Sequence, residues 1–597
     1  MREMTLGHLL LNESLPPQYK LSGPIDKKVL KTRLSSLAKE DPRAYTAAIT
    51  NIKRIGDLVA TREGISIGLD DIAPDPKAKG AFVHKYNNLL GKAKSDEEKG
   101  NILVQAQREA QVINNQHTGT MNTMRKSGGR GNTVQMMKMN VAPVVIGDRH
   151  GKPIPQFISH SYSEGLTPGE YWTAGNEARE LLIKGQLSTA EPGDLGKVLS
   201  NNMNSQVVTV TDCGTDNGRL FSITDPNITD RYLAKPVKGR PRNTLITSRL
   251  VSDLRKQRVA DVVVRSPLTC ESKDGVCQKC MGLNERGQSF EIGTNAGLRS
   301  AQALTEPLTQ MVLSSKHGIN LVDDDNLKGY AALRQTVDSP GSFVNKAILA
   351  EKRGRVTQVS KAPQGGNFVH VDGDEHYVPP NLRVTVKVGD NVYAGDQLSS
   401  GTPAPADVVR LRGLGMGRDH MVREIDNIYK GSGVNLDQRH AELLTRSHLN
   451  HVQLQNSAGD FLRGDTVEYN RLKDYTSQGS VGTPVDKAVD QTLAADYLHY
   501  TAGTLVTPFV RDTLKRGGIT EVRTSTDKSP TFQSVFSPLT RAPLNNPDWM
   551  ARLNHRWLKD SIMSGAQFGQ VTDVHGVNPI PALAYGKEFG KGKDGKY

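Results

Sequence analysis

The sequence is poor in cysteine, in aromatic residues and in long apolar runs. Only four of its 597 residues are cysteines, and Phe, Trp and Tyr together make up 5%. Four cysteines are too few to cross-link a chain of this length, which excludes a disulfide-rich secreted scaffold. No apolar run approaches the roughly 18 residues of a membrane-spanning helix, and the opening MREMTLGHLLLNESLPP lacks a signal-peptide cleavage site. We therefore expect a cytoplasmic protein that has no membrane partner.

The charge balance is moderately basic. Lys and Arg number 76 against 63 Asp and Glu, which gives a formal net charge of +13. This excess is as compatible with ordinary solubility as with a negatively charged partner. Hydrophobic residues make up 36% and charged residues 23% of the chain, which excludes a membrane protein and a wholly disordered one. At roughly 150 residues per domain, the length predicts about three or four domains.

Periodicity and turn signals predict an α+β chain of several parts. Thr167, Pro168 and Glu170 have the types expected at the N-cap, the first position and the capping-box position of a helix. That helix should run within 163–201 and be kinked at Pro192. Other expected helices cover most of 1–60 and then 79–115, 301–317, 406–430 and 437–450. Short strands are expected at 64–71, 207–264 and 340–402, with weak patterns beyond 480 and no repeat at solenoid spacing.

The cysteines are clustered in the sequence. Three of them form the pattern Cys270-x6-Cys277-x2-Cys280, with Gly275 just before the CxxC pair, and Cys213 is the only other one. Zn²⁺ prefers four soft ligands in tetrahedral geometry, and a closed four-cysteine set is typical of a structural site. The alternative, a redox-active CxxC, lacks the surrounding βαβ pattern of thioredoxin-like proteins. We predict a structural zinc site formed by Cys213, Cys270, Cys277 and Cys280.

One predicted helix face combines an amide, an apolar side chain and an imidazole. Intervals of three and four residues place four side chains on it: Thr309, Gln310, Leu313 and His317. Such a face could bind a sugar, a base and a phosphate, although a lone histidine on a helix is more often structural. Two acidic clusters, 323–325 and 372–374, lie in polar loop contexts, so we do not predict a catalytic metal at either.

Several blocks resemble, in collinear order, the β′ (largest) subunit of bacterial-type multisubunit RNA polymerase. CGT at 213–215, TCESKDGVCQKCMGLNERGQ and AGLRSAQALTEPLTQMVLSSKHG resemble its zinc site and trigger-loop segment. The resemblance spans roughly residues 4–480. It also includes MTLGHLLLNESLP, SGGRGNTVQ, SEGLTPGEYW with the STAEPGDLGKVL that follows, GDQLSSGTPAPADVVRLRGLG and VREIDNIYKGSGVNLDQRHAELL.

The resemblance implies an α+β, multi-domain architecture with a long bridge helix, trigger-loop helices, β-rich modules and a four-cysteine zinc site. The implied regions are a helical funnel or rim (1–126), an active-centre element with the bridge helix (127–206), a zinc-binding region (207–292), a trigger-loop region (293–340), a β-rich module (341–402), a helical clamp or jaw-side region (403–480) and a divergent C-terminal region with subunit contacts and a flexible tail (481–597).

The resemblance also implies roles for individual residues. Gln310 would face the ribose of the incoming nucleotide, Leu313 would pack on its base and His317 would approach its β-phosphate, with Thr309 in the same folding helix. Arg130 would contact the triphosphate. Thr189 and Ala190 would lie against the template base pair, and Arg179 and Lys197 would face the nucleic-acid backbone.

The family's catalytic NADFDGD motif, whose aspartates hold Mg²⁺, does not occur in the sequence. We therefore interpret the chain as the C-terminal part of a split β′. Such splits occur in cyanobacteria, plastids and some large bacteriophages, and the short stretch between His317 and Val356 favours a phage-like version. The implied partners are an N-terminal β′ fragment with the DFDGD motif, β-type subunits, a promoter-specificity factor, template DNA, RNA and nucleoside triphosphates. The implied location is the host bacterial cytoplasm, with packaging in a virion left open.

Two departures from the family pattern are present. The family's Met-Arg-Thr-Phe-His is here Leu313-Ser314-Ser315-Lys316-His317, and Pro192 is unusual for a bridge helix. Both put the speed and fidelity of nucleotide addition in doubt, not the reaction class. The alternative function is a non-catalytic β′-like protein that binds nucleic acid or a polymerase and regulates transcription. The altered serines and lysine favour it slightly, whereas the retained Gln310, Leu313 and His317 favour the enzyme.

Overall fold

The computed structural model describes residues 5–64, 66–148, 153–186, 190–272, 275–314, 327, 329–542 and 558–569. Helices and strands are mixed, as predicted. The chain divides into two compact units, one formed mainly by residues 1–189 and the other mainly by residues 190–597. Within the described part of the chain, every helix is too short or too polar to cross a lipid bilayer.

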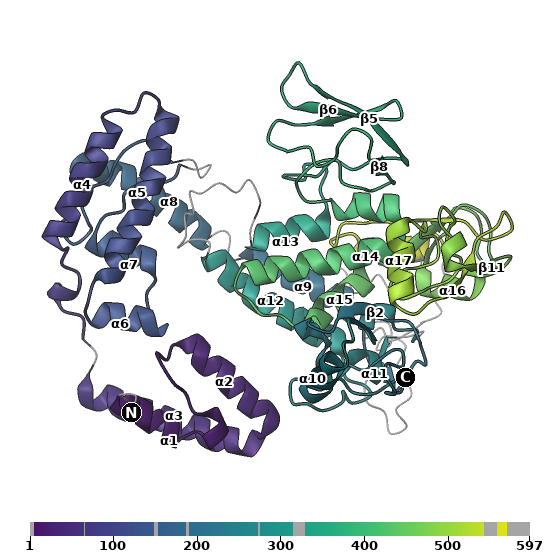
Figure 1. Ribbon diagram of the computed structural model, residues 1–597, viewed down its shortest axis with the longest axis horizontal. Coiled ribbons are helices and arrows are strands. Elements are labelled where there is room, and N and C mark those ends of the chain that lie inside the picture. The colour runs from purple at the N-terminus through teal and green to yellow at the C-terminus, as the bar shows by residue number, and fades with distance from the viewer. Residues whose placement is uncertain are drawn as a thin grey trace. The chain divides into compact units, whose positions relative to one another are not determined.

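The first unit is helical over most of its length (Figure 1). Residues Leu34, Leu37 and Ala48 join two of its helices in a small core, and Phe82, Leu103 and their neighbours form a second core. Its helices are α1 (Leu6–Glu13), α2 (Lys27–Glu40), α3 (Pro42–Glu63), α4 (Pro76–Leu90), α5 (Asp96–Gln116), α6 (Thr120–Ser127), α7 (Thr133–Asn140) and α8 (Pro168–Gln186).

Two expectations for this unit are wrong. The predicted strand at 64–71 is instead a short 3₁₀ helix, η2 (Leu69–Asp71), in the part of that segment that the structure describes. The predicted single helix over 79–115 is two helices, α4 and α5, because Ser95 begins a new one. The Ser95 hydroxyl accepts a hydrogen bond from the Glu98 amide, and acidic residues fill the first turn of α5, where the helix dipole favours them.

The start of α8 is confirmed as a capping box. The Thr167 hydroxyl accepts a 3.4 Å hydrogen bond from the Glu170 amide, and the Glu170 carboxylate accepts one from the Thr167 amide at 3.0 Å. The same carboxylate accepts bonds from the amides of Ser159 at 2.8 Å and His160 at 3.2 Å. Glu170 thereby ties the start of α8 to the chain that precedes it.

The expected kink at Pro192 stays a prediction. Pro192 lies in α9 (Ala190–Met203), whose first described residue is Ala190. The three residues between α8 and α9, 187–189, lie outside the described residues.

The second unit mixes helices with small sheets. Its elements after α9 are β1 (Val208–Val210), β2 (Arg219–Ser222), α10 (Ser248–Lys256), β3 (Asp261–Val264), β4 (Val276–Cys277), α11 (Gln278–Met281), α12 (Ala296–Ser314), α13 (Gly329–Asp338), β5 (Gly354–Lys361), β6 (Asn367–Val371), β7 (Asp374–Val378), β8 (Asn391–Val392), α14 (Pro405–Gly431), α15 (Gln438–His448), β9 (His451–Leu454), β10 (Thr466–Glu468), α16 (Tyr469–Thr476), β11 (Val481–Pro484), α17 (Pro508–Arg516), β12 (Glu521–Thr524), β13 (Phe532–Ser534) and α18 (Leu558–Gln567). The helices predicted at 406–430 and 437–450 are confirmed as α14 and α15.

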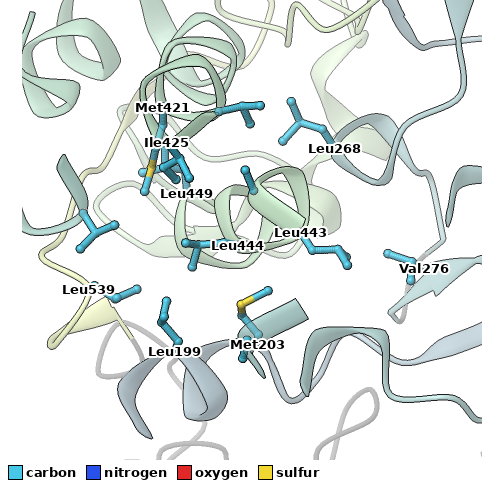
Figure 2. Close-up of a cluster of buried hydrophobic side chains, with 14 of the residues drawn as sticks. Leu199, Met203, Leu268, Val276, Met421, Ile425, Leu443, Leu444, Leu449 and Leu539 are labelled. Carbon is cyan, nitrogen blue, oxygen red and sulfur yellow. The ribbon is translucent and has the colours of Figure 1, made fainter. Parts of the chain in front are cut away.

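The main apolar core of this unit joins α9, α12, α13, α14, α15 and α16. Figure 2 shows side chains of α9, α14 and α15 converging with residues next to the cysteines. The strands predicted within 340–402 are confirmed as a four-stranded antiparallel sheet in the order β7-β6-β5-β8. Its own small core contains Val356, Val369 and Val378. The labelled residues of the main core are Leu199, Met203, Leu268, Val276, Met421, Ile425, Leu443, Leu444, Leu449 and Leu539.

The second unit contains the same strand–loop–helix–strand arrangement twice, in segments 219–264 and 481–524. In each copy the first strand pairs antiparallel with the last, β2 with β3 and β11 with β12. The helix begins at Ser248 in one copy and 260 residues later, at Pro508, in the other. The isolated bridges repeat with the same shift: Tyr232 with Leu245 and Thr492 with Leu505, then Val237 with Arg240 and Tyr497 with Tyr500. The sequence analysis missed this duplication, because it searched only for repeats at short spacing.

A fully buried carboxylate holds the first copy against α15. Glu442 of α15 is 0% exposed and accepts hydrogen bonds from Arg219 at 2.6 Å, from Arg231 at 2.8 and 3.0 Å, and from the Ser266 hydroxyl at 2.6 Å. Burial alone would raise the pKa of Glu442, but the charges of Arg231 and Arg219 lower it. The carboxylate is therefore ionised inside the protein.

Replacing Glu442 by Gln should destabilise the protein strongly. The change removes the counter-charge of the buried Arg231 and leaves Arg219 with Asp419, 2.9 Å away, as its remaining carboxylate. Breaking a comparable buried pair costs about 3–5 kcal/mol. Urea unfolding of the full chain, followed by fluorescence, measures the free energy of unfolding. Glu375→Gln, at an exposed position of β7, is the control and should leave that energy unchanged. An equal stability of the two variants would contradict the role assigned to Glu442.

Glu170→Gln should weaken the start of α8 in a pH-dependent way. Burial opposes ionisation of Glu170, but hydrogen bonds from Thr167, Ser159 and His160 lower its pKa from 4.5 to about 2. The carboxylate thus stabilises the fold above pH 4.5, and this contribution is lost as the pH falls towards 2. Losing its charge should cost about 1–3 kcal/mol of local stability at neutral pH.

Amide hydrogen exchange measures this effect. The amides of Ser159, His160 and Thr167 should exchange faster in the variant than in the wild type at pH 6, and the difference should vanish near pH 2. Glu97→Gln, at an exposed position of α5, serves as the control. A difference that persists unchanged at low pH would contradict the assignment.

Candidate functional site

The four cysteines come together because two short strands pair across a long sequence interval. β1 pairs parallel with β4, with Val208 opposite Val276 and Val210 opposite Cys277. This pairing places the turn that carries Cys213 beside the CxxC segment. Cys277 then begins α11, and Cys270 follows the 3₁₀ helix η4 (Pro267–Thr269).

The arrangement of the cysteine sulfurs suits a tetrahedral metal ion. All four Sγ atoms lie within 4.8 Å of one another, and those of Cys213 and Cys280 are 3.8 Å apart. Four sulfurs at about 2.3 Å from a zinc ion would be separated by about 3.8 Å. The same distance is far too long for a disulfide bond. The structure therefore confirms the predicted four-cysteine cluster, which could hold a metal.

Gly275 is required by the turn that precedes the CxxC pair. Its φ is +63°, and a Cβ atom there would lie 2.0 Å from the carbonyl oxygen of Val207. Backbone amides then point at the sulfurs: that of Cys277 donates to Cys270 Sγ at 3.4 Å, and that of Cys280 to Cys277 Sγ at 3.3 Å. Such donors stabilise thiolates, the form in which cysteine binds metal.

The thiols have different acidities. Burial raises the pKa of Cys270 and of Cys280. Hydrogen bonds from the other three cysteines lower the pKa of Cys213. A divalent cation would favour the ionised form of all four thiols, so the four sulfurs together could hold a metal.

Two arginines of α15 fix the backbone around the cluster. Arg446 donates to the carbonyl oxygens of Pro267 at 3.2 Å, Cys270 at 2.6 Å, Ser272 at 3.3 Å and Gly275 at 3.2 Å. Arg439 donates at 2.6 Å to the carbonyls of both Met281 and Leu283. The sequence analysis missed both arginines. The only sequence signal is their spacing of seven residues, which places them on one helix face.

The predicted nucleotide-contacting face lies at the end of α12. Thr309 and Gln310 are exposed there. Leu313 belongs to α12 by its backbone, whereas its side chain and all of His317 lie outside the described residues. The structure therefore describes part of this face, and the role of the face stays a prediction.

The middle of α12 contains a proline and is bonded to a tyrosine of α14. Pro307 lies inside the helix and removes one backbone donor from the last turns. The hydroxyl of Tyr429, which is 0% exposed, donates a 2.6 Å hydrogen bond to the carbonyl of Leu304. This bond anchors α12 to α14 beside the point where the helical hydrogen bonding is interrupted.

α9 approaches α12 at a glycine. A Cβ atom on Gly196 would lie only 2.7 Å from the Thr305 side chain. Ala190 and Lys197 are exposed on α9, and Thr189 lies outside the described residues. The second unit therefore contains Ala190, a predicted contact of the template base pair, and Lys197, a predicted contact of the nucleic-acid backbone, on the helix that approaches α12.

The remaining predicted cations belong to the first unit. Arg130 is exposed in the loop between α6 and α7, where its guanidinium donates to the Gly129 carbonyl at 3.3 Å. Arg179 is exposed on α8, and its Cζ atom lies 5.8 Å from the centre of the Trp172 ring. Both side chains are exposed to solvent, as a contact to a phosphate requires.

The expectation that the two acidic clusters hold no catalytic metal stays a prediction. Among the residues that the structure describes, the cysteines are the only group of three or more metal-binding side chains. Asp372 accepts a hydrogen bond from the Arg355 amide and Asp374 pairs with Lys352. The other cluster, 323–325, lies outside the described residues.

Comparison with known proteins agrees with these features. The family model of RNA polymerase Rpb1, domain 5, matches residues 165–364 and 346–525. The chain is 29% identical over 519 residues to the DNA-directed RNA polymerase subunit beta' of Pseudarthrobacter chlorophenolicus, covering 79% of this chain and 40% of that protein. The subunit beta' of Kocuria rhizophila is 30% identical over 516 residues, which are 78% of this chain and 39% of that protein.

The chain thus spans about two fifths of the length of the curated relatives it matches. The matched family segments cover more than half of the chain and include all four cysteines, α9, α12 and α15. The chain therefore belongs to the RNA polymerase Rpb1, domain 5, family.

Proposed function

We propose that the chain is a subunit of a multisubunit DNA-dependent RNA polymerase. The observation that carries this proposal is the match of residues 165–525 of this chain to the Rpb1 domain 5 family model. The similar curated proteins are named DNA-directed RNA polymerase subunit beta'. In this proposal the subunit contributes to template-directed nucleotidyl transfer and is active only in the assembled complex. We propose further that this chain is the C-terminal part of a split β′ and that a separate chain supplies the aspartates that hold the catalytic Mg²⁺.

The proposed active-centre elements are α8 with α9 as the bridge helix and α12 with the residues after it as the trigger loop. Gln310 would bind the ribose, Leu313 would pack on the base, Thr309 would support the same face, and His317 would steady negative charge on the β-phosphate. The exposure of Gln310 at the end of an anchored helix supports this assignment.

The other proposed contacts are with nucleic acid and the triphosphate. Arg130 would bind the triphosphate through its fork of donors, and Arg179 and Lys197 would bind phosphates of the nucleic-acid backbone. Thr189 and Ala190 are small enough to lie against the template base pair. Their roles rest on the resemblance.

The proposed metal of the cysteine cluster is Zn²⁺, in a structural role. Four thiolates complete its coordination sphere and leave no position for substrate. The partners in this proposal are an N-terminal β′ fragment with the DFDGD motif, β-type subunits, a promoter-specificity factor, DNA, RNA and nucleoside triphosphates. The proposed origin is a large bacteriophage, with the enzyme working in the host cytoplasm.

Affinity purification of the tagged chain from its native source tests the split-subunit proposal. We expect it to bring down a second chain that contains a DFDGD motif, together with a β-type subunit, and the complex should extend RNA on a DNA template. The expectation follows from the missing aspartates, because the chain cannot hold the catalytic Mg²⁺ by itself. Mass spectrometry identifies the partners.

Purification from an unrelated bacterium that expresses the chain alone is the control for adventitious partners. Recovery of the chain without polymerase subunits, yet bound to nucleic acid, would refute the enzyme proposal. Recovery with a complete host polymerase that already contains its own β′ would favour the alternative, a non-catalytic regulator.

His317→Ala tests the proposed trigger loop within the assembled enzyme. Losing one group that stabilises charge in the transition state should slow nucleotide addition by roughly 10²-fold. Rapid-quench measurement of single nucleotide additions gives the rate. His370→Ala, in β6, is the matched control and should leave the rate unchanged. Equal rates for both variants would refute the role of His317.

A further inference from the structure

A buried arginine lies directly against the cysteine cluster. Arg265 is 0% exposed, and its Nη2 atom is 3.2 Å from the Sγ of Cys213, 3.5 Å from that of Cys277 and 3.4 Å from that of Cys280. Its Nε donates to Cys280 Sγ at 3.4 Å. One guanidinium group therefore contacts three of the four sulfurs.

Two further side chains fix the orientation of this guanidinium. Nη2 also donates to Asp212 Oδ1 at 2.7 Å, and Nη1 donates to Asn243 Oδ1 at 3.0 Å. Asn243 Nδ2 in turn donates to Asp212 Oδ2 at 2.7 Å. The three side chains form a closed ring of hydrogen bonds that directs the remaining donors of Arg265 at the sulfurs.

The duplicated unit shows that the fold does not need this arginine. Arg265 follows β3 directly, and Ser525 holds the equivalent place after β12. The amide of Arg265 donates to the Tyr232 carbonyl at 2.8 Å, and that of Ser525 donates to the Thr492 carbonyl at the same distance. The second copy thus makes the same backbone hydrogen bond although its residue at this position, Ser525, carries no charge.

Asn243, which accepts a hydrogen bond from Arg265, is likewise replaced in the second copy by a residue without a polar side chain. Asn243 has a φ of +64°, and the equivalent Gly503 has a φ of +84°. Glycine is the usual residue in this left-handed region. Asn243 therefore occupies a position where glycine suffices for the turn, and it uses its amide to hold Arg265.

We propose that Arg265 is the charge partner of the metal-loaded cysteine site. A divalent cation with four thiolates carries a formal charge of −2, which is costly to bury. The guanidinium reduces this charge, and its N–H donors bind lone pairs of the coordinated sulfurs. Arg265 thus slows release of the bound metal and protects the thiolates from oxidation. The inference depends on the zinc site proposed above, not on the polymerase activity.

Zinc loss from the full chain tests the inference. The purified protein is mixed with excess chelator, and zinc release is followed by the absorbance of a metal indicator. Arg265→Ser, the residue that the second copy carries, should weaken zinc binding 10–100-fold, the usual effect of losing a group that supports a metal ligand. Asn243→Gly should show a smaller loss, because Arg265 remains but is less firmly held.

Matched controls separate this effect from general damage. Ser525→Ala changes the equivalent position of the other copy and should leave zinc binding unchanged, whereas Cys277→Ser removes a ligand and defines full loss. Cobalt-substituted protein adds a direct probe of the sulfurs. Removing N–H donors raises the energy of sulfur lone pairs, so Arg265→Ser should shift the sulfur-to-cobalt absorption to longer wavelength.

The outcomes distinguish the two levels of the proposal. A wild-type chain that purifies without zinc and takes up none would refute the zinc site itself. Wild-type zinc binding in both Arg265→Ser and Asn243→Gly, with an unshifted cobalt spectrum, would refute the role of Arg265 alone. If Arg265→Ser fails to fold, Asn243→Gly decides, because its backbone conformation is one that glycine already adopts in the second copy.

Discussion

The carboxylate of Glu442 is the interaction on which the second unit depends. It is buried in α15 and pairs with Arg231 and with Arg219, which Asp419 also pairs with. It also binds the hydroxyl of Ser266, next to the arginine that contacts the sulfurs. An ionised carboxylate inside a protein is stable only with such partners. Because its arginine partners come from segments about 200 residues away in the sequence, this group, together with Gln438, holds the first copy of the duplicated unit on α15.

The same helix determines the geometry of the cysteine cluster. Arg446 and Arg439 donate to backbone carbonyls on both sides of the CxxC pair, so the loops that carry the ligands are held by α15 before any metal binds. Arg265 then adds a positive charge at the sulfurs. The positive charge of Arg446 opposes the effect of burial, which raises the pKa of Cys270. α15 connects this site to the core that it shares with α9 and α14.

The sequence was sufficient for two features whose signals are local. The cap of α8 and the ligand spacing around Cys277 follow from residues a few positions apart, and both were predicted correctly. The break at Ser95 was missed because a continuous polar helical pattern outweighed one N-cap residue. The charged face of α15 resembles a solvated surface in the sequence, since burial of Glu442 depends on partners that only the tertiary structure supplies. His317 and Thr189 lie outside the described residues, so their predicted roles rest on the resemblance.

The duplicated unit separates the requirements of folding from those of the site. Its two copies keep the same strand pairing and left-handed turn positions, and they pack together around Ala234, Val263, Leu493 and Val522. Where the copies share a property, such as the threonine that caps each helix, the fold requires it. The side chains of Arg265 and Ser525 differ, but their backbone amides make equivalent hydrogen bonds. The side chain of Arg265 is therefore not needed for the backbone bond, and it contacts the neighbouring cysteines instead. Comparing the two copies thus separates Arg265 and Asn243, which contact the cysteine cluster or support that contact, from the residues that the strand pairing and the turn need.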